Sequence, residues 1–387
     1  MYFRILSLEM SRKHTCFLWG PRQTGKTTLL KSLFPNAFTY DLLLSDQYRR
    51  LMRNPELLRQ ESDARGLTGE NQKDPVIIDE VQKVPDLLDE VHWLIENRGL
   101  RFILCGSSAR KLKREKANLL GGRAARYELF PLVSEEIENF SLIKAFNHGL
   151  LPPHYAQEDP SRLLQAYVGD YLREEIVAEA ATRNVSAFGK FLEVAGLSNG
   201  EIINYSNIAR ECGVSSPTVK AYFQILEDTH IGCIVPAFHK RGRRRIIEAH
   251  KFYFFDIGIV SALTRRGHVE PGSELFGRVL EHFLFMELRA HSHYSGFFYP
   301  INYWRTASGQ EVDFILNNGQ IVLEVKATRT AQTHHLRGLR AFREDYRPER
   351  CILISLDPRP RKTSEGIEIL PVSEFLQDLW DNRIITP

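Results

Sequence analysis

A phosphate-binding pattern, G-x-x-x-x-G-K-T, lies near the start of the chain at residues 20–27. An apolar run at 15–19 precedes it and a segment with helical spacing at 27–34 follows, so the pattern joins a predicted strand to a predicted helix. The backbone N–H groups of such a loop, with the helix N-terminus, cradle phosphates. The residues that we expect at the nucleotide are Gly20, Pro21, Arg22, Gln23, Thr24, Gly25, Lys26, Thr27 and Thr28. Lys26 would reach the β- and γ-phosphates and the Thr27 hydroxyl would hold Mg²⁺, which predicts a site for ATP with magnesium.

Two carboxylates end the apolar run Val76-Ile77-Ile78-Asp79-Glu80, about fifty residues after the loop. An acid at the end of a strand beside the loop strand can order the magnesium ion and its water shell. A second acid can polarise the attacking water as a general base. We therefore assign Asp79 to the metal and Glu80 to the water, which predicts ATP hydrolysis.

Small polar residues follow the next predicted strand, which covers residues 101–106. Ser107 and Ser108 are both candidates to lie between the carboxylates and the γ-phosphate and so to report the nucleotide state. The sequence does not choose between them, and a helix N-cap is the competing role for either serine.

Two arginines follow a pair of glycines, in the order Gly121-Gly122-Arg123-Ala124-Ala125-Arg126. An arginine displayed on a glycine turn is a candidate to stabilise the charge of the transition state, in its own site or across a subunit interface. We favour Arg123 for this role over Arg126. A surface arginine in a loop is the alternative.

A second set of acids lies on a predicted hairpin in the last third of the chain. Segments 311–316 and 321–326 alternate like half-buried strands, and Asn-Gly in the connection is a strong hairpin signal. With Asn318 and Gly319 as the turn residues, Leu316 faces Ile321 and Asp313 faces Glu324, with Cβ atoms roughly 4.5–5.5 Å apart.

Lys326 falls on the same face of this hairpin as the two acids, because side chains alternate along a strand. Two acids and a lysine around Mg²⁺ could cleave a phosphodiester, because the metal activates water and the lysine steadies developing charge. The arrangement resembles PD-(D/E)XK nucleases, whose leading helix commonly adds an acid; Glu281 fits that place. A non-cleaving domain that binds nucleic acid, with an ionic Asp–Lys–Glu cluster, is the alternative.

The elements between these sites have the pattern of a winged helix. Residues 205–213 and 218–226 read as two helices joined by a short turn, which is a helix-turn-helix signature. Two strands, 231–235 and 251–255, flank a basic hairpin tip, the predicted wing. The cations that we expect at DNA phosphates are Lys220, Lys240, Arg241, Arg243, Arg244 and Arg245. A solvated basic loop, or a contact with an acidic neighbouring subunit, is the alternative.

Composition sets the remaining limits. The chain has 387 residues with 43% hydrophobic and 26% charged residues and a net charge of +3, so any nucleic-acid surface depends on local clusters. Its five cysteines are scattered, which argues against a zinc site or a disulfide framework. No leader peptide and no apolar run of about 18–20 residues is recognisable, so we expect no membrane partner and a cytoplasmic location.

The segments GPRQTGKTTLL, VIIDEVQKVPDLL, LCGSSARKL and LLGGRAARYELFPLVSEEI resemble a large prokaryotic family of AAA-type ATPases with a C-terminal domain of nuclease-like fold. The resemblance spans nearly the whole chain. It implies an additional-strand, RecA-like parallel sheet and assembly into homo-oligomers, with a hexamer as one ring size among others. One departure is that no arginine-bearing helical lid motif follows Leu132, so a second sensor has no candidate.

The predicted fold class is therefore α/β with three domains. They are a P-loop AAA-type parallel-sheet domain at 1–150, a helical region with a winged helix at 151–256, and a PD-(D/E)XK-like α/β domain at 257–387. The predicted function is an ATP-hydrolysing, DNA-stimulated motor acting on duplex or branched DNA. The alternative is a nucleotide-dependent switch that binds a protein partner through an inactive nuclease-like domain.

Overall fold

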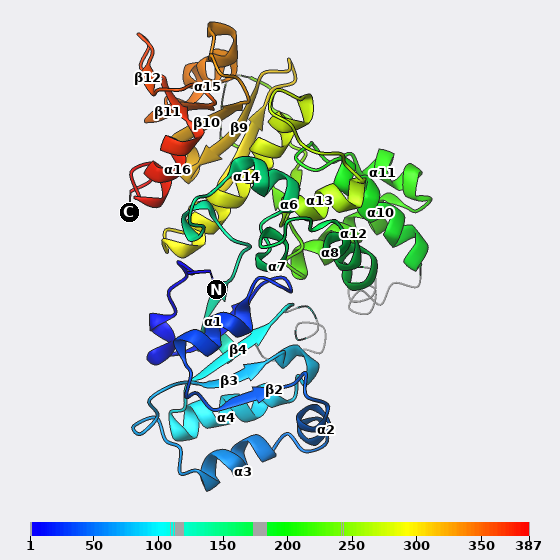
Figure 1. Ribbon diagram of the computed structural model, residues 1–387, viewed down its shortest axis with the longest axis vertical. Coiled ribbons are helices and arrows are strands. Elements are labelled where there is room, and N and C mark those ends of the chain that lie inside the picture. The colour runs from blue at the N-terminus through cyan, green and yellow to red at the C-terminus, as the bar shows by residue number, and fades with distance from the viewer. Residues whose placement is uncertain are drawn as a thin grey trace.

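The fold was obtained as a computed structural model, which describes residues 2–108, 110, 112, 120–172, 184–240, 242 and 244–386. Figure 1 shows a sheet formed by the first third of the chain, a second sheet formed by the last third, and a helical region beside the junction between them. The long helix α14 (Glu274–Tyr294) runs through this junction toward the N-terminal sheet.

The N-terminal sheet has five strands in the order β2-β3-β4-β1-β5, and every neighbouring pair is parallel. A strand therefore separates the phosphate-loop strand β1 from β3, which carries the acids, as the additional-strand topology requires. The strands are β1 (Thr15–Trp19), β2 (Thr39–Asp41), β3 (Val76–Asp79), β4 (Phe102–Gly106) and β5 (Ala124–Glu128). The predicted α/β class and parallel sheet are confirmed.

Both faces of this sheet are covered, because the central strands are apolar on both sides. Cys16 and Leu18 face α1, whereas Phe17 and Trp19 share a core with α2, α3 and α4. These helices are α1 (Lys26–Leu33), α2 (Ser45–Arg53), α3 (Leu57–Ala64) and α4 (Leu87–Arg98).

The middle of the chain is helical and ends in a two-stranded antiparallel sheet. Its helices are α6 (Leu142–His148), α7 (Pro152–Tyr155), α8 (Ser161–Ala166), a π-helical turn (Tyr167–Leu172), α10 (Val185–Leu197), α11 (Tyr205–Cys212), α12 (Ser216–Asp228) and α13 (Ile257–Thr264). Gly213, with φ of 65°, ends α11, and the Ser215 side chain caps α12 by accepting from Thr218 N at 3.3 Å. The strands are β6 (Gly232–Val235) and β7 (Lys251–Phe254). The expected helix pair and strands are present, while a winged-helix fold remains a prediction.

The C-terminal sheet has six strands in the order β12-β13-β11-β10-β9-β8. Leu316 pairs with Ile321 and Phe314 with Leu323 across β9 and β10, which confirms the predicted hairpin register. The strands are β8 (Ile301–Arg305), β9 (Glu311–Leu316), β10 (Ile321–Lys326), β11 (Arg350–Ser355), β12 (Arg361–Lys362) and β13 (Glu368–Pro371). The helices that follow β7 and α13 are α14, α15 (Arg337–Tyr346) and α16 (Val372–Trp380). A PD-(D/E)XK-like assignment of this sheet remains a prediction.

The hairpin between β6 and β7 lies along the edge of the C-terminal sheet. Ala237 forms a bridge to Tyr303 of β8, and Ile246 forms one to Thr306 just after β8. Phe238 packs on Phe342 of α15. Both arms of the predicted wing therefore contact the neighbouring C-terminal sheet and α15, and a role of this hairpin in DNA binding stays a prediction.

The largest apolar core joins residues 132–155 to the C-terminal part of the chain, where it includes α14 and α16. The domain limits at 150 and 256 stay predictions. Short 3₁₀ turns occur at Glu9–Arg12, Val81–Lys83, Leu120–Gly122, Ser134–Glu136, Asn317–Gly319 and Thr333–Leu336. None of the described helices combines the length and apolar character needed to cross a lipid bilayer.

Candidate functional site

The phosphate loop connects β1 to α1 in the conformation that anion binding requires. Gly20 has φ of 151°, and a Cβ there would lie 2.4 Å from the Leu129 carbonyl oxygen, so only glycine fits. Gln23 and Gly25 have φ of 64° and 94°, which turns the backbone between Pro21 and Lys26. Thr24 is buried and its hydroxyl donates to the Pro21 carbonyl at 2.9 Å, which closes the turn. The backbone thus forms a preshaped loop ahead of the helix N-terminus.

Lys26 lies inside this loop. Its Nζ donates to the carbonyl oxygens of Gly20 at 2.6 Å and Pro21 at 2.9 Å. Burial lowers the pKa of Lys26, against the attraction of nearby acidic groups that include Glu80 and Asp79. Carbonyl oxygens are neutral, so they do not neutralise the charge of the buried ammonium, and this charge can still attract an anion. The residue is therefore placed to contact a phosphate with a small movement.

Thr27 and Asp79 meet at the loop. The Thr27 hydroxyl donates to Asp79 Oδ2 at 2.7 Å, and the Glu80 backbone N–H donates to Asp79 Oδ1 at 3.0 Å. A hydroxyl and a carboxylate oxygen at hydrogen-bond distance are the pair that holds magnesium in P-loop nucleotide sites. The donor set therefore fits MgATP. Thr28 follows on α1 as an exposed residue.

Gln82 connects Glu80 with one of the two candidate serines. Glu80 has φ of 59°, and Gln82 Nε2 donates to Glu80 Oε2 at 2.5 Å and to Ser107 Oγ at 3.1 Å. Ser107 therefore belongs to the carboxylate network. Gln82 was not predicted; the available signal was a buried amide two residues after an acid that ends a strand.

Ser108 points instead toward the middle region. Its Oγ accepts from Arg110 N at 3.0 Å and donates to the Asp228 carbonyl at 3.4 Å, while Arg110 Nη1 pairs with Asp228 Oδ2 at 2.7 Å. The geometry thus separates two roles that the sequence left open. Ser107 faces the acid site, and Ser108 caps the next turn and contacts the end of α12.

Arg123 lies at the end of the sheet opposite to its own phosphate loop. It precedes Ala124, which pairs with Thr15 at the start of β1, so the five residues of β1, about 16 Å, separate Arg123 from Gly20. Arg123 forms an ion pair with Glu96 of α4. A role in its own site has no geometric support, and a role across a subunit interface stays a prediction.

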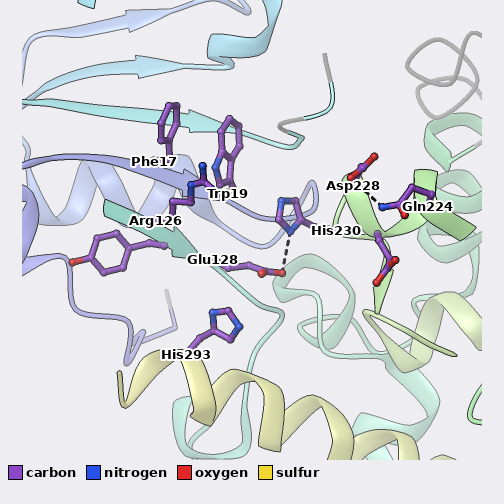
Figure 2. A pocket seen from close by; sticks show the side chains of 10 residues that line it. Phe17, Trp19, Arg126, Glu128, Gln224, Asp228, His230 and His293 are labelled. Atoms are coloured by element: carbon purple, nitrogen blue, oxygen red, sulfur yellow. Dashed lines mark hydrogen bonds and ion pairs between the residues drawn. The ribbon is translucent and has the colours of Figure 1, made fainter. Parts of the chain in front are cut away.

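A cavity of about 320 Å³ lies between the edge of the N-terminal sheet and the middle region (Figure 2). Arg126 and Glu128 of β5 line it beside Phe17 and Trp19 of β1, and His230 and His293 face them.

Glu128 holds this junction together. It pairs with His230 at 3.1 Å and with Arg289 of α14 at 2.8 Å. Burial would raise the pKa of Glu128, but the Arg289 and His230 charges outweigh burial and hold it well below its usual range. This ionic contact therefore ties the N-terminal sheet to both later parts of the chain.

The four residues predicted for a nuclease-like site, Glu281, Asp313, Glu324 and Lys326, do come together. Lys326 Nζ pairs with Glu324 Oε1 at 2.5 Å, and Asp313 Oδ2 accepts from Val325 N at 2.7 Å. Burial, with the Glu281 carboxylate beside it, raises the pKa of Asp313 to about 6. Burial and Asp313 also raise the pKa of Glu324. Raised pKa values of this kind are typical of carboxyl groups that lie close together and are shielded from water.

A second lysine, missed by sequence reasoning, reaches this acid cluster from β7. Lys251 is 3% exposed, and its Nζ pairs with Glu281 Oε1 at 3.1 Å and with Glu311 Oε1 at 2.8 Å. Tyr253 donates its hydroxyl to the same Glu281 oxygen. No signal in the sequence linked Lys251 to acids 30 and 60 residues later.

The acid cluster also contains Lys251, which the predicted site did not include, and a magnesium site here stays a prediction. Among the described residues, no three His, Cys, Asp or Glu side chains are arranged to hold a metal ion. Lys251 and Lys326 supply positive charge at these acids. Beside the cluster, Glu311, Glu324 and Lys326 line an open cleft of about 660 Å³ together with His334, Arg337 and Arg340.

The predicted DNA-contacting cations have different surroundings. Arg244 has a side chain that is 27% exposed, and it pairs with Asp345 at 2.7 Å and with Glu344, both on α15. Lys240 and Arg245 are exposed, and so is Lys220, which lies 5.2 Å from the centre of the Tyr205 ring. Arg241 and Arg243 lie outside the described residues.

Three family models match successive parts of the chain. Residues 12–138 match an AAA domain, residues 139–270 match a domain of unknown function (DUF8612), and residues 276–375 match another domain of unknown function (DUF4143). The first match and the parallel five-stranded sheet together support an AAA-type P-loop domain in the N-terminal part.

Two bacterial proteins are similar to most of this chain. An uncharacterized protein of Mycobacterium tuberculosis is 24% identical over 384 residues, which cover 96% of this chain and 83% of the relative. An uncharacterized protein of Haemophilus influenzae is 21% identical over 321 residues, with 78% and 76% covered.

Two solved structures match this chain at low similarity. The Aeropyrum pernix ORC1 protein in complex with DNA has a TM-score of 0.24 and 11% identity, over 66% of this chain and 87% of that one. A signal transduction ATPase with numerous domains from Pyrococcus horikoshii has a TM-score of 0.22 and 15% identity, over 73% and 44%. Both TM-scores are too low to establish a common fold.

Proposed function

We propose that the protein hydrolyses ATP in its N-terminal domain and uses the hydrolysis cycle to reposition its middle and C-terminal parts on DNA. The observation that carries the ATPase proposal is the contact of Thr27 with Asp79 at 2.7 Å, directly beside a loop that encloses the Lys26 ammonium. A phosphate loop, a hydroxyl and a strand-end carboxylate in this arrangement have a specific use in nucleotide hydrolysis.

Each side chain of the site has a separate task. Lys26 and the loop N–H groups hold the phosphates, and Thr27 with Asp79 would hold Mg²⁺, which supplies Lewis-acid stabilisation when bound. Glu80 accepts a proton from the attacking water as general base. Gln82 keeps the Glu80 carboxylate oriented, since it bridges Glu80 and Ser107. Loss of the γ-phosphate would therefore change the position of Ser107 through the Gln82 amide.

The same strand end offers a route from nucleotide state to the middle region. Ser107 is followed by Ser108, and Ser108 with Arg110 contacts Asp228, the last residue of α12. Glu128 binds His230 two residues further on. A shift at the end of β4 is thus expected to move α12.

DNA is the proposed partner because exposed cations remain on α12 and on the β6–β7 hairpin. Lys220, Lys240 and Arg245 are exposed and could each neutralise a phosphate, which gives salt-dependent binding without base specificity. Arg123, far from its own loop, is proposed to act across a homo-oligomer interface.

A second candidate function is a nucleotide-dependent switch that binds a protein partner. It is favoured by the pairing of Arg244 with acids of α15 and by the two lysines in the acid cluster. These contacts reduce the charge available for DNA and for a metal. A free-standing nuclease is the third possibility and requires metal-dependent cleavage that disappears in Asp313→Ala.

One experiment separates these functions. ATP hydrolysis is measured with and without duplex and branched DNA, with Glu80→Gln as control, and the same reactions are assayed for Mg²⁺-dependent strand cleavage. DNA-stimulated hydrolysis without cleavage is expected. Hydrolysis that ignores DNA, with no salt-sensitive DNA binding, would favour the switch. If the wild type hydrolyses ATP no faster than Glu80→Gln, the ATPase proposal is refuted.

A further inference from the structure

Arg4, in the segment that precedes the N-terminal sheet, contacts the backbone of the phosphate loop. Its Nη1 donates to the Thr24 carbonyl oxygen at 2.6 Å. A Cβ added to Gly25 would lie 3.7 Å from the same nitrogen, so the guanidinium lies next to Gly25, whose φ of 94° places it in the left-handed region. No sequence pattern marks this arginine.

The contact with Thr24 has a chemical consequence for anion binding. The Thr24 carbonyl and the Gly25 N–H belong to one peptide group, and a hydrogen bond to a carbonyl polarises its peptide group and strengthens the N–H donor. The Gly25 N–H is one of the loop groups that face phosphate in sites of this kind. Arg4 therefore shapes the loop and strengthens its donors without touching the nucleotide.

The Arg4 guanidinium is itself held rigidly by buried partners. Its Nε forms an ion pair with Glu136 Oε2 at 2.9 Å, and the two side chains are 7% and 0% exposed. Glu136 Oε1 also accepts from Ile5 N at 2.8 Å. Because a buried charge that loses its partner is costly, Arg4 has one favourable position, and the loop is tied to it.

The same guanidinium also reaches the C-terminal part of the chain. Its Nη2 donates to the Phe130 carbonyl at 2.7 Å and lies 3.4 Å from the hydroxyl of Tyr294, the last residue of α14. The Phe130 N–H donates to that hydroxyl at 3.0 Å. Tyr294 therefore completes the pocket that fixes Arg4.

Helix α14 links this contact to the acid cluster. Glu281 lies thirteen residues before Tyr294 on the same helix, which corresponds to about 20 Å along its axis. A displacement of α14 at the acid cluster would be transmitted to Tyr294, because a helix moves as a rigid rod over that length.

We propose that Arg4 is a positioning residue for the phosphate loop, through which the docking of α14 sets the affinity for the nucleotide phosphates. The inference rests on the proposed ATPase function and adds the element that regulates it. By linkage, nucleotide binding must stabilise the docked position of α14 to the same extent as docking strengthens nucleotide binding.

Steady-state hydrolysis by the full-length protein tests the proposal with three variants. Arg4→Lys keeps the charge but loses the fork of donors, and Tyr294→Phe removes only the hydroxyl. Arg12→Lys is the matched control, because Arg12 belongs to the same segment but is 56% exposed and pairs with Asp74. We expect KM for ATP to rise about tenfold in Arg4→Lys and about threefold in Tyr294→Phe, with kcat changed less than threefold in both.

A merely structural role predicts the opposite pattern, since a smaller folded fraction lowers the apparent kcat and leaves KM unchanged. The double variant should show no more than the Arg4→Lys effect, because both changes act through one contact. Hydrogen exchange supplies the reciprocal test: ATP should slow exchange of amides in the last turn of α14 in the wild type and not in Arg4→Lys.

Unchanged KM values in both variants, or additive effects in the double variant, would overturn the inference. The ATPase proposal would still stand in that case, because the wild type hydrolyses ATP. Wild-type protein without hydrolysis would instead refute the ATPase proposal. If Arg4→Lys does not fold, Tyr294→Phe alone decides, because its loss leaves the Arg4–Glu136 pair in place.

Discussion

Two groups of carboxylates in this protein are stabilised in different ways. At the phosphate loop, Asp79 accepts from the Thr27 hydroxyl and Glu80 from the Gln82 amide, which are neutral donors. In the acid cluster, Glu281 and Glu324 are paired with the ammonium groups of Lys251 and Lys326. The Lys26 ammonium beside the first pair donates to carbonyl oxygens, whereas the ammonium groups of the acid cluster pair directly with its carboxylates.

Residue types alone therefore do not separate acids that need a ligand cation from acids that the protein pairs with its own lysines. Acids placed together need a cation, and the protein either provides it as a buried lysine or leaves that part to a metal. A strand with Asp, Glu and Lys at nuclease-like spacing is compatible with both outcomes. The decisive information is the identity of the groups that face the acids from other elements, here Lys251 of β7.

Removal of the Lys251 ammonium is expected to have the largest effect. Lys251→Met would take the buried ammonium from Glu281 and Glu311, whose side chains are 22% and 27% exposed, and lower the free energy of unfolding by about 3 kcal/mol. Urea denaturation measures the loss, with Lys220→Met as the control, since Lys220 is exposed. A variant as stable as the wild type would mean that the acids do not depend on this lysine.

The acid of the phosphate loop is expected to matter for chemistry instead. Asp79→Asn should lower kcat for ATP hydrolysis about 100-fold, which equals a barrier increase of about 3 kcal/mol, because it removes a carboxylate from the magnesium position. Asp313→Asn, the same substitution in the acid cluster, should leave hydrolysis within threefold of wild type. Phosphate release assays on both proteins test the contrast, and equal losses would contradict it.

The acid cluster should also give the protein a distinctive pH dependence. The pKa of Asp313 is about 6 in the folded protein against an ordinary value of 3.8, so the folded state binds this proton more tightly than the unfolded chain. Stability from this group is therefore greatest below pH 4 and falls as the pH rises to about 6. The two-unit difference corresponds to about 2–3 kcal/mol.

Asp313→Asn removes this dependence and should be more stable than wild type at pH 7.5 by up to that amount, with the two proteins converging near pH 4. Urea denaturation across this range measures the difference. Parallel stability curves for the two proteins would show that Asp313 titrates normally.

The hairpin arginines should show the smallest effect. Arg244→Ala is expected to cost about 1 kcal/mol of stability, because it removes a half-buried pair with Asp345, whereas the exposed neighbour in Arg245→Ala should cost nothing measurable. DNA binding at low salt should respond in the reverse order. A stronger defect in DNA binding in Arg244→Ala than in Arg245→Ala would show that the hairpin separates from α15 when it binds DNA.

The sequence predicted those features that depend on neighbours along the chain. The phosphate loop is specified by its own glycines and by the apolar strand before it, so its place between β1 and α1 followed directly. The register of the β9–β10 hairpin followed from Asn318-Gly319, because the turn fixes which residues pair. The parallel N-terminal sheet was expected from the resemblance to AAA-type ATPases, which these segments carry.

Features that depend on distant segments were not predictable. Lys251 reaches Glu311 across sixty residues, and Arg4 reaches Tyr294 across 290. Neither residue lies in a recognisable pattern, and each is positioned by the packing of whole elements. The same limit applies to Arg123, whose distance from the loop became clear only from the parallel pairing of β5 with β1.

The hairpin that lies along β8 has a practical consequence for dividing the chain. Through Ala237 and Ile246 it satisfies backbone groups at the border of the C-terminal sheet, next to Tyr303 and Thr306. A fragment that starts after residue 256 would expose this border as an unpaired strand edge and would also lack Lys251. Open edges invite strand pairing between molecules, so such a fragment is expected to aggregate, whereas one that begins before β6 should stay dispersed.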